Sequence, residues 1–191
     1  MWLFLAQEIL FFGGLFLTYA VYRSLYPEAY AAASHELDIT LGGINTAVLI
    51  TSSLTMAMAV HSAHAGRRKA ILGWLVATLA LGGAFLGIKA VEYAAKFEHH
   101  LFPGPHFQFP DPALAAPARI YYSLYFAMTG MHALHMVIGF GILLWLIWLT
   151  ARGRITAQRA APVEMTGLYW HFVDIVWIFL FPLLYLIGRH G

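Results

Sequence analysis

The sequence contains no cysteine, and this absence removes a whole group of sites from consideration. A chain without thiols cannot form disulfides, and it cannot hold iron–sulfur clusters, copper or zinc through thiolates. Ten histidines remain among the 191 residues. Haem or metal bound by imidazole therefore has to be considered separately.

Charged residues are also scarce, since they make up 10% of the chain whereas hydrophobic residues make up 61%. A soluble domain carries about 25% charged residues, so this composition indicates an integral membrane protein. The N-terminus lacks the basic stretch of a cleaved signal, and we expect its long apolar run to be retained. The sequence shows neither strand alternation nor a strong internal repeat, which argues against a β-barrel and against a transporter built from inverted halves.

Five apolar segments are each long enough to cross a bilayer, whose ~30 Å core requires about 20 helical residues. Their approximate bounds are residues 2–22, 42–61, 70–92, 120–149 and 167–188. Backbone polar groups must be satisfied inside the membrane, so each segment is expected to be a helix. The predicted fold class is an all-α integral membrane bundle of five transmembrane helices, forming one domain over residues 1–191.

Basic residues in the connections predict the orientation, because cytoplasmic loops are enriched in lysine and arginine. The second and fourth connections hold Arg67, Arg68, Lys69, Arg152, Arg154 and Arg159. The opposite side holds Arg23, Lys96, Arg119 and Arg189, mixed with acidic residues. We therefore expect a cytoplasmic N-terminus and an outside C-terminus. The run GRRK, with Arg67, Arg68 and Lys69, is first a topology signal and also a candidate contact for phospholipid head groups.

Glu8, in FLAQEILFFGGLF, is the most costly polar residue within these segments. A charged acid at this depth costs ~2.5–3.5 kcal/mol, so burial favours the neutral carboxyl. Two interpretations stay open. Glu8 is either a proton-relay or gating carboxyl, or a protonated structural acid that donates a hydrogen bond to a neighbouring helix.

His132 and His135, in TGMHALH, lie on one helix face, and His171 falls at a similar depth on the last segment. These imidazoles could ligate haem or a metal, although the carboxylate spacing of a metal site between helices is missing. We favour a structural polar network of His132, His135, His171 and Asp174, without metal. Asp174 follows His171 by three residues, so the two are expected to pair across one helical turn.

Lys89 and Glu92, in FLGIKAVEY, form a further pair three residues apart, near the outer end of the third segment. Lys89 can extend toward water, so we expect a solvated or lipid-facing ion pair. Hydroxyl residues of the second segment are expected to bond backbone carbonyls or neighbouring helices, and the glycines to allow close helix approach. The loop histidines His99, His100 and His106 lack a fixed ligand spacing and are expected to be surface residues.

Five of these stretches together resemble subunit III of the haem–copper respiratory oxidases. They are FLAQEILFFGGLF, NTAVLITSSLTMAMAVHSAHAGRRK, FLGIKAVEY, TGMHALHMVIG and YWHFVDIVWIFLF, and they occur in the order typical of that family. The resemblance is to the five-helix bacterial form, because the two further N-terminal helices of many members are not in this sequence. Lys89 also departs from the family, in which glutamine or glutamate is common at this position.

The resemblance implies a non-catalytic subunit of a terminal oxidase that reduces oxygen to water and moves protons outward across a bacterial cytoplasmic membrane. Family members carry no haem or copper of their own, bind phospholipid in a cleft of the bundle, support proton uptake into subunit I and protect the oxidase during turnover. Glu8 matches the family's carbodiimide-reactive acid. The positions matching its structural signature residues are Glu92, His132, His135, His171 and Asp174.

The implied partners are subunits I and II, which hold the haem and copper, and phospholipids. A small subunit IV is an optional further partner, and cytochrome c is the expected electron donor to the complex; no nucleic-acid partner is expected. Related alternatives are subunit III of a quinol oxidase and the accessory subunit of nitric oxide reductase. Two other classes stay open: a haem-binding electron-transfer protein that uses His135 and His171, and an independent proton channel or transporter.

Overall fold

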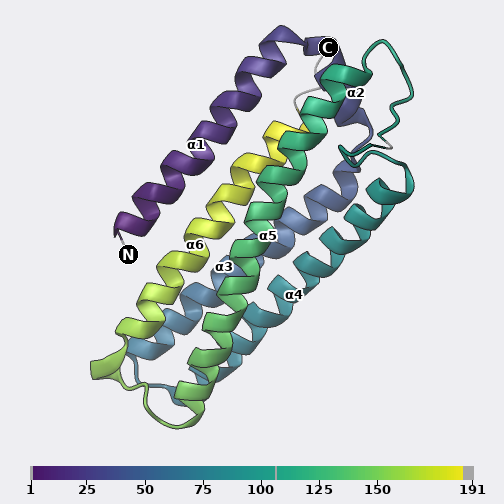
Figure 1. Cartoon of the computed structure of the whole chain (residues 1–191). Helices are drawn as coiled ribbons and strands as arrows, with labels where there is room; N and C mark the ends of the chain where they lie inside the picture. The colour runs from purple at the N-terminus through teal and green to yellow at the C-terminus, as the bar shows by residue number, and fades with distance from the viewer. Residues whose placement is uncertain (1, 106, 187–191) are drawn as a thin grey trace. The chain divides into compact units, whose positions relative to one another are not determined.

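A computed structural model describes residues 2–105 and 107–186, and Figure 1 colours them in chain order from purple to yellow. The long helices are α1 (Trp2–Leu25), α3 (Ile39–His64), α4 (Arg68–Glu98), α5 (Ala115–Ala151) and α6 (Ala161–Phe181). A π-helical turn, η2 (Pro182–Leu186), continues α6, and a 3-10 turn, η1 (Ala157–Arg159), precedes it. These described ranges contain no β-strand.

The five predicted spans all form helices that are long and apolar enough to cross a membrane, which confirms the all-α, multi-pass fold class. Most helices extend beyond the apolar segments at one or both ends. The fourth predicted span, for example, is a helix of 37 residues. Residues 187 and 188 of the last predicted span lie outside the described residues, as do His106 and Arg189.

A short helix in the first connection, α2 (Pro27–His35), was not predicted from the sequence. Pro27 occupies the beginning of this helix, where its missing N–H has no intrahelical partner to lose. Glu28 lies in the first turn, near the positive end of the helix dipole. Alanine, the best helix former, makes up much of the remainder.

The chain divides into two compact units, and each of them is described by itself. The first unit comprises the described residues of 2–43, 88–131 and 178–186, and the second comprises residues 44–87 and 132–177. The prediction of a single transmembrane domain stays a prediction.

The ends of the long helices follow from identifiable local signals. Asp38 begins α3, because its Oδ1 accepts the backbone N–H groups of Thr40 and Leu41 at 2.8 and 3.1 Å. Gly66 and Gly153 follow α3 and α5 with φ of +66° and +71°. This left-handed conformation, which glycine adopts without a Cβ clash, reverses the chain in the Schellman motif that closes a helix.

The α4 helix ends with the same hydrogen-bond pattern but without glycine. The His100 and Leu101 N–H groups donate to Phe97 and Lys96 carbonyls at 3.2 and 3.0 Å, and His100 has a φ of +54°. A non-glycine residue in this region is uncommon and carries a Cβ clash. The predicted surface residue His100 is therefore a helix-terminating residue under local strain.

The packing of the second unit centres on Trp170, which is fully buried. A Cβ added to Gly82 or to Gly139 would lie 3.0 or 2.9 Å from its indole ring, so both helices approach the ring through the space that a side chain would occupy. The indole N–H donates to Ser52 Oγ at 3.0 Å. Small residues thus allow α4 and α5 to pack closely around an aromatic anchor from α6, as expected for helices in a membrane.

Candidate functional site: two buried polar clusters

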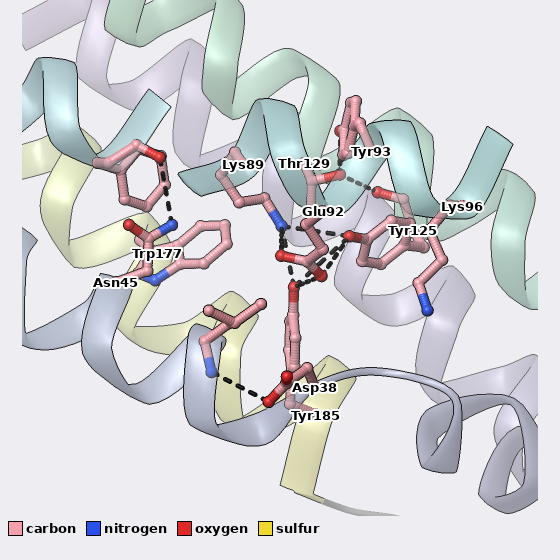
Figure 2. A network of polar contacts seen from close by, with 12 residues as sticks. Asp38, Asn45, Lys89, Glu92, Tyr93, Lys96, Tyr125, Thr129, Trp177 and Tyr185 are labelled. Carbon is pink, nitrogen blue, oxygen red and sulfur yellow. Dashed lines mark hydrogen bonds and ion pairs between the residues drawn. The ribbon is translucent and has the colours of Figure 1, made fainter. Parts of the chain in front are cut away.

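A buried ion pair in the first unit carries the densest set of polar contacts in the described chain. Lys89 Nζ lies 2.9 Å from Glu92 Oε2, and only 6% and 4% of their side-chain surfaces are exposed. Lys89 also donates to the hydroxyls of Tyr125 and Tyr185 at 3.2 and 2.9 Å. Figure 2 shows the four side chains converging from α4, α5 and η2. We call these four residues the Lys89 cluster.

The carboxylate of the Lys89 cluster is satisfied as fully as the ammonium group. Glu92 Oε1 accepts a hydrogen bond from the Tyr125 hydroxyl at 2.8 Å and another from the Tyr185 hydroxyl. The three N–H groups of Lys89 have three acceptors, so neither charge is left unpaired. The ammonium also lies 5.2–5.6 Å from the ring centres of Tyr93, Tyr125 and Tyr185, within the range of cation–π attraction.

The expectation of a solvated or lipid-facing ion pair was therefore wrong on exposure, although the pair itself is formed. Lys89 does not extend toward water, because hydroxyl and carboxylate acceptors surround it inside the unit. A charge can remain in such a place only when paired and hydrogen-bonded. Tyr125 and Tyr185, which make this possible, were missed. The signal that could have pointed to them is the presence of a lysine and a glutamate within one apolar segment, because such a buried pair needs neutral hydrogen-bonding side chains around it.

Further tyrosines contact the backbone of η2 in the first unit. Tyr19 donates to the carbonyl of Leu183, and Tyr121 donates to that of Leu184, both at 2.7 Å. Both carbonyls belong to η2, so these hydroxyls from α1 and α5 bond directly to its backbone. Tyr30 packs edge-on against both rings at 5.3 and 5.2 Å between ring centres. Tyr19 of α1 and Tyr121 of α5 thus hold η2, and Tyr30 of α2 packs against both of their rings.

Glu8 lies on α1 in the first unit, and 8% of its surface is exposed. Its chain neighbours Ile9 and Leu10 are 60% and 77% exposed. Among the five candidate spans, this helix has the smallest buried share. The one carboxyl of α1 is thus turned away from an otherwise apolar and exposed surface, as both interpretations of Glu8 require.

Hydroxyl residues of α3 form the second polar cluster, within the second unit. Thr55 Oγ1 lies 2.8 Å from Thr78 Oγ1, and Ser52 Oγ lies 3.5 Å from the Thr78 carbonyl. Trp177 Nε1 donates to Thr46 Oγ1 at 3.1 Å. These contacts confirm that the α3 hydroxyls serve backbone carbonyls and neighbouring helices.

His171 and Asp174 do not pair across a turn as expected. The Nδ1 atom of His171 lies 2.6 Å from Ser53 Oγ, so the imidazole is directed toward α3. Asp174 is 2% exposed, and no described residue lies within hydrogen-bond geometry of its carboxylate oxygens. His171 therefore bonds to the hydroxyl of Ser53 on another helix instead of to Asp174. The sequence alone could not show that these two residues would meet.

His132 and His135 occupy different surroundings in the second unit. His132 is 1% exposed, and its ring centre lies 5.4 and 5.1 Å from those of Phe85 and Trp177. His135 is 7% exposed, and its backbone carbonyl accepts the Tyr169 hydroxyl at 2.8 Å. Within residues 2–105 and 107–186, no three His, Asp or Glu side chains converge as a metal site would require. The role of the four network residues stays a prediction.

The basic connections come together at one end of the second unit. The Arg68 guanidinium donates to the carbonyls of Thr150, at 2.8 Å, and Ala151, and His64 Nε2 lies 3.1 Å from Glu164 Oε1. Arg68 therefore caps α5, and it is exposed, as are Arg67 and Lys69. The six basic residues of these connections share one end, as the orientation argument assumed; its cytoplasmic location stays a prediction.

Comparison with known proteins assigns this arrangement to a family. Residues 1–189 match the family model of cytochrome c oxidase subunit III. Cytochrome c oxidase subunit 3 of Thermostichus vulcanus is 32% identical over 187 residues, covering 97% of this chain and 85% of the relative. Quinol oxidase subunit 3 of Bacillus subtilis is 36% identical over 192 residues, covering 100% and 86%. Cytochrome bo(3) ubiquinol oxidase subunit 3 of Pseudomonas aeruginosa is 34% identical over 192 residues, covering 98% and 83%.

Such a match over the whole chain, on five helices able to cross a membrane, confirms the resemblance drawn from the motifs. The chain therefore belongs to the cytochrome c oxidase subunit III family, as a multi-pass bacterial membrane protein and a subunit of a haem–copper oxidase complex.

Proposed function

We propose that this chain is an accessory subunit without a catalytic centre of its own. The observation that carries the proposal is the full-length match to subunits that occur in both cytochrome c oxidases and quinol oxidases. A subunit of one design that serves two electron donors has no need to recognise either. Donor recognition and oxygen reduction then belong to other subunits.

The geometry of the Lys89 cluster supports this role. A catalytic acid or base must be within hydrogen-bond reach of a reacting proton. Lys89 and Glu92 instead form their hydrogen bonds with each other and with two tyrosines. The cluster is suited to holding helices together in a membrane.

The proposed partners are subunits I and II, which would hold haem and copper, with a small subunit IV as an optional addition. Phospholipid is the further proposed ligand. Exposed large apolar side chains on α1, α5 and α6 offer surface to lipid and to partner helices. Glu8 is the proposed proton-linked acid, through which the chain would support proton uptake by subunit I.

Purification through an affinity tag on this chain tests the proposal. We expect haem and copper to co-purify with the chain from mild detergent, and oxygen consumption with reduced cytochrome c or with quinol to identify the donor. After the subunits are separated, the chain should show no Soret band. A Soret band from the separated chain would support haem ligation by His135 and His171 instead. Proton flux in liposomes that contain only this chain would support a channel.

A further inference from the structure

The second unit contains only two acidic residues, Glu164 and Asp174, and their surroundings differ sharply. Glu164 Oε1 lies 3.1 Å from His64 Nε2, and 43% of the Glu164 side chain is exposed. Asp174 is 2% exposed, and among the described residues its carboxyl has neither an ion-pair partner nor a hydrogen-bond donor. Only Glu164 therefore has the water and the partner that an ionised carboxyl requires.

The side of α6 that carries Asp174 faces hydroxyl residues of α3, but these hydroxyls bond to its neighbours. His171, Asp174 and Trp177 follow one another at intervals of three residues, so they lie on one side of α6. His171 Nδ1 lies 2.6 Å from Ser53 Oγ, and Trp177 Nε1 donates to Thr46 Oγ1 at 3.1 Å. Asp174 thus lies between two polar contacts of α6 with α3 and takes part in neither.

The permanent cations of the second unit are too distant to neutralise Asp174. All lysines and arginines of this unit lie within residues 67–69 and 152–159, at the end where α6 begins. At 1.5 Å per residue, Asp174 lies about 20 Å along α6 from Ala161. The other titratable groups on the helices of this unit are imidazoles, and they are His61, His64, His132, His135 and His171. None of these imidazoles forms an ion pair with Asp174.

We propose that Asp174 is a proton-binding site of the second unit and that it holds its proton at neutral pH. A carboxylate that is buried without a counter-charge is very costly, so such a group binds a proton and becomes neutral. The first unit neutralises a buried carboxyl in the opposite way, because Glu92 lies against the ammonium group of Lys89. Proton binding at Asp174 requires neither Glu8 nor the proposed accessory role.

Infrared spectroscopy of the whole purified complex tests the site, because a protonated carboxyl has a carbonyl stretching band that a carboxylate lacks. At pH 7 we expect Asp174→Asn to remove the acid-band intensity of one carboxyl per complex and to leave the carboxylate bands unchanged. The control variant is Glu164→Gln, at the other acid of the unit, and it should remove carboxylate intensity without loss of acid-band intensity. In wild-type complex labelled with carbon-13 at the aspartate carboxyl, the same acid band should shift to lower frequency, a measurement that does not depend on whether the variant folds.

Loss of carboxylate intensity in Asp174→Asn would overturn the proposal, because it would show that Asp174 is ionised in the wild type. Acid bands that are identical in the wild type and Asp174→Asn would also overturn it, as would acid bands that do not shift with labelled aspartate. Loss of the same acid band in Glu164→Gln would assign the band to another carboxyl, with the same consequence. Failure of the wild-type chain to co-purify haem would refute the accessory-subunit function, a result separate from the infrared bands.

Discussion

The Lys89 cluster makes a sharp quantitative prediction about stability, because both of its charges are buried. Breaking a buried ion pair by removing one partner costs about 3–5 kcal/mol. We expect Lys89→Met to destabilise the chain by about 3 kcal/mol, at the lower end of that range. Glu92 would still accept two tyrosine hydroxyls in this variant. Glu92→Gln should cost a similar amount, since it leaves the ammonium without a counter-charge.

The double variant Lys89→Met/Glu92→Gln leaves no buried charge in the cluster, so its cost should fall below the sum of the two single costs by about 2–3 kcal/mol. Unfolding of the purified chain by SDS in mixed micelles, followed by tryptophan fluorescence, gives these free energies. The matched control is the exposed pair of His64 and Glu164, whose side chains are 57% and 43% exposed. Glu164→Gln should cost less than about 1 kcal/mol.

Additive single effects, or a cost for Lys89→Met no larger than that of Glu164→Gln, would refute the reasoning. Either result would mean that the two charges do not depend on each other inside the first unit. The tyrosine variants locate the remaining contribution. Tyr125→Phe and Tyr185→Phe should each cost about 1.5–3 kcal/mol, the range for hydrogen bonds to charged groups.

Four further predictions concern single side chains. Tyr30→Phe should leave stability at pH 7 unchanged or raise it by up to about 1 kcal/mol, because the hydroxyl is buried without a hydrogen-bond partner among the described residues. Burial raises the pKa of Tyr30 from 10.0 to about 12. The wild type should therefore lose stability relative to the variant as the pH rises from 10 to 12. A difference between their melting temperatures that stays constant over this pH range would contradict the prediction. His100→Gly should stabilise the chain by about 0.5–1 kcal/mol in thermal melting, because glycine adopts its φ of +54° without strain; Ser123→Gly, inside a helix, should destabilise it. Gly139→Ala should cost about 1–3 kcal/mol, since its Cβ would lie 2.9 Å from the Trp170 ring, whereas Gly141→Ala meets no atom within 4 Å and should be tolerated. A hydrophobic carbodiimide should label Glu8, and Glu8→Gln should abolish the labelling detected by mass spectrometry; persistent labelling would assign the reactive acid to another residue.

The sequence was sufficient for the membrane class and for the five spans because both depend on apolar length alone. It was not sufficient for α2, in which the signals at Pro27 and Glu28 are local and the helix is only nine residues long. The lengths of the helices were also underestimated, because the apolar segments stop before most of the helices end. Charged residues such as Arg68 and Glu98 can be helical at the boundary of an apolar core, where hydropathy no longer distinguishes helix from loop.

The sequence predicted which side chains form polar contacts, but it did not predict which residue of another helix each of them contacts. Lys89 and Glu92 pair because their spacing along α4 already brings them together. The same spacing in His171 and Asp174 gave no pair, because Ser53 lies 2.6 Å from the imidazole. Periodicity describes one helix at a time. It cannot state which hydroxyl of another helix competes for a side chain.

Ser53 therefore imposes a constraint on the second polar cluster that no single helix reveals. Its hydroxyl lies 2.6 Å from Nδ1 of His171, so the two groups share one hydrogen bond. If Ser53 donates that hydrogen bond, Nδ1 carries no proton. If the imidazole carries its proton on Nδ1, it donates to the serine oxygen instead. The tautomer of the half-buried histidine is thus coupled to the orientation of one hydroxyl on another helix, and a substitution at either position should alter the other.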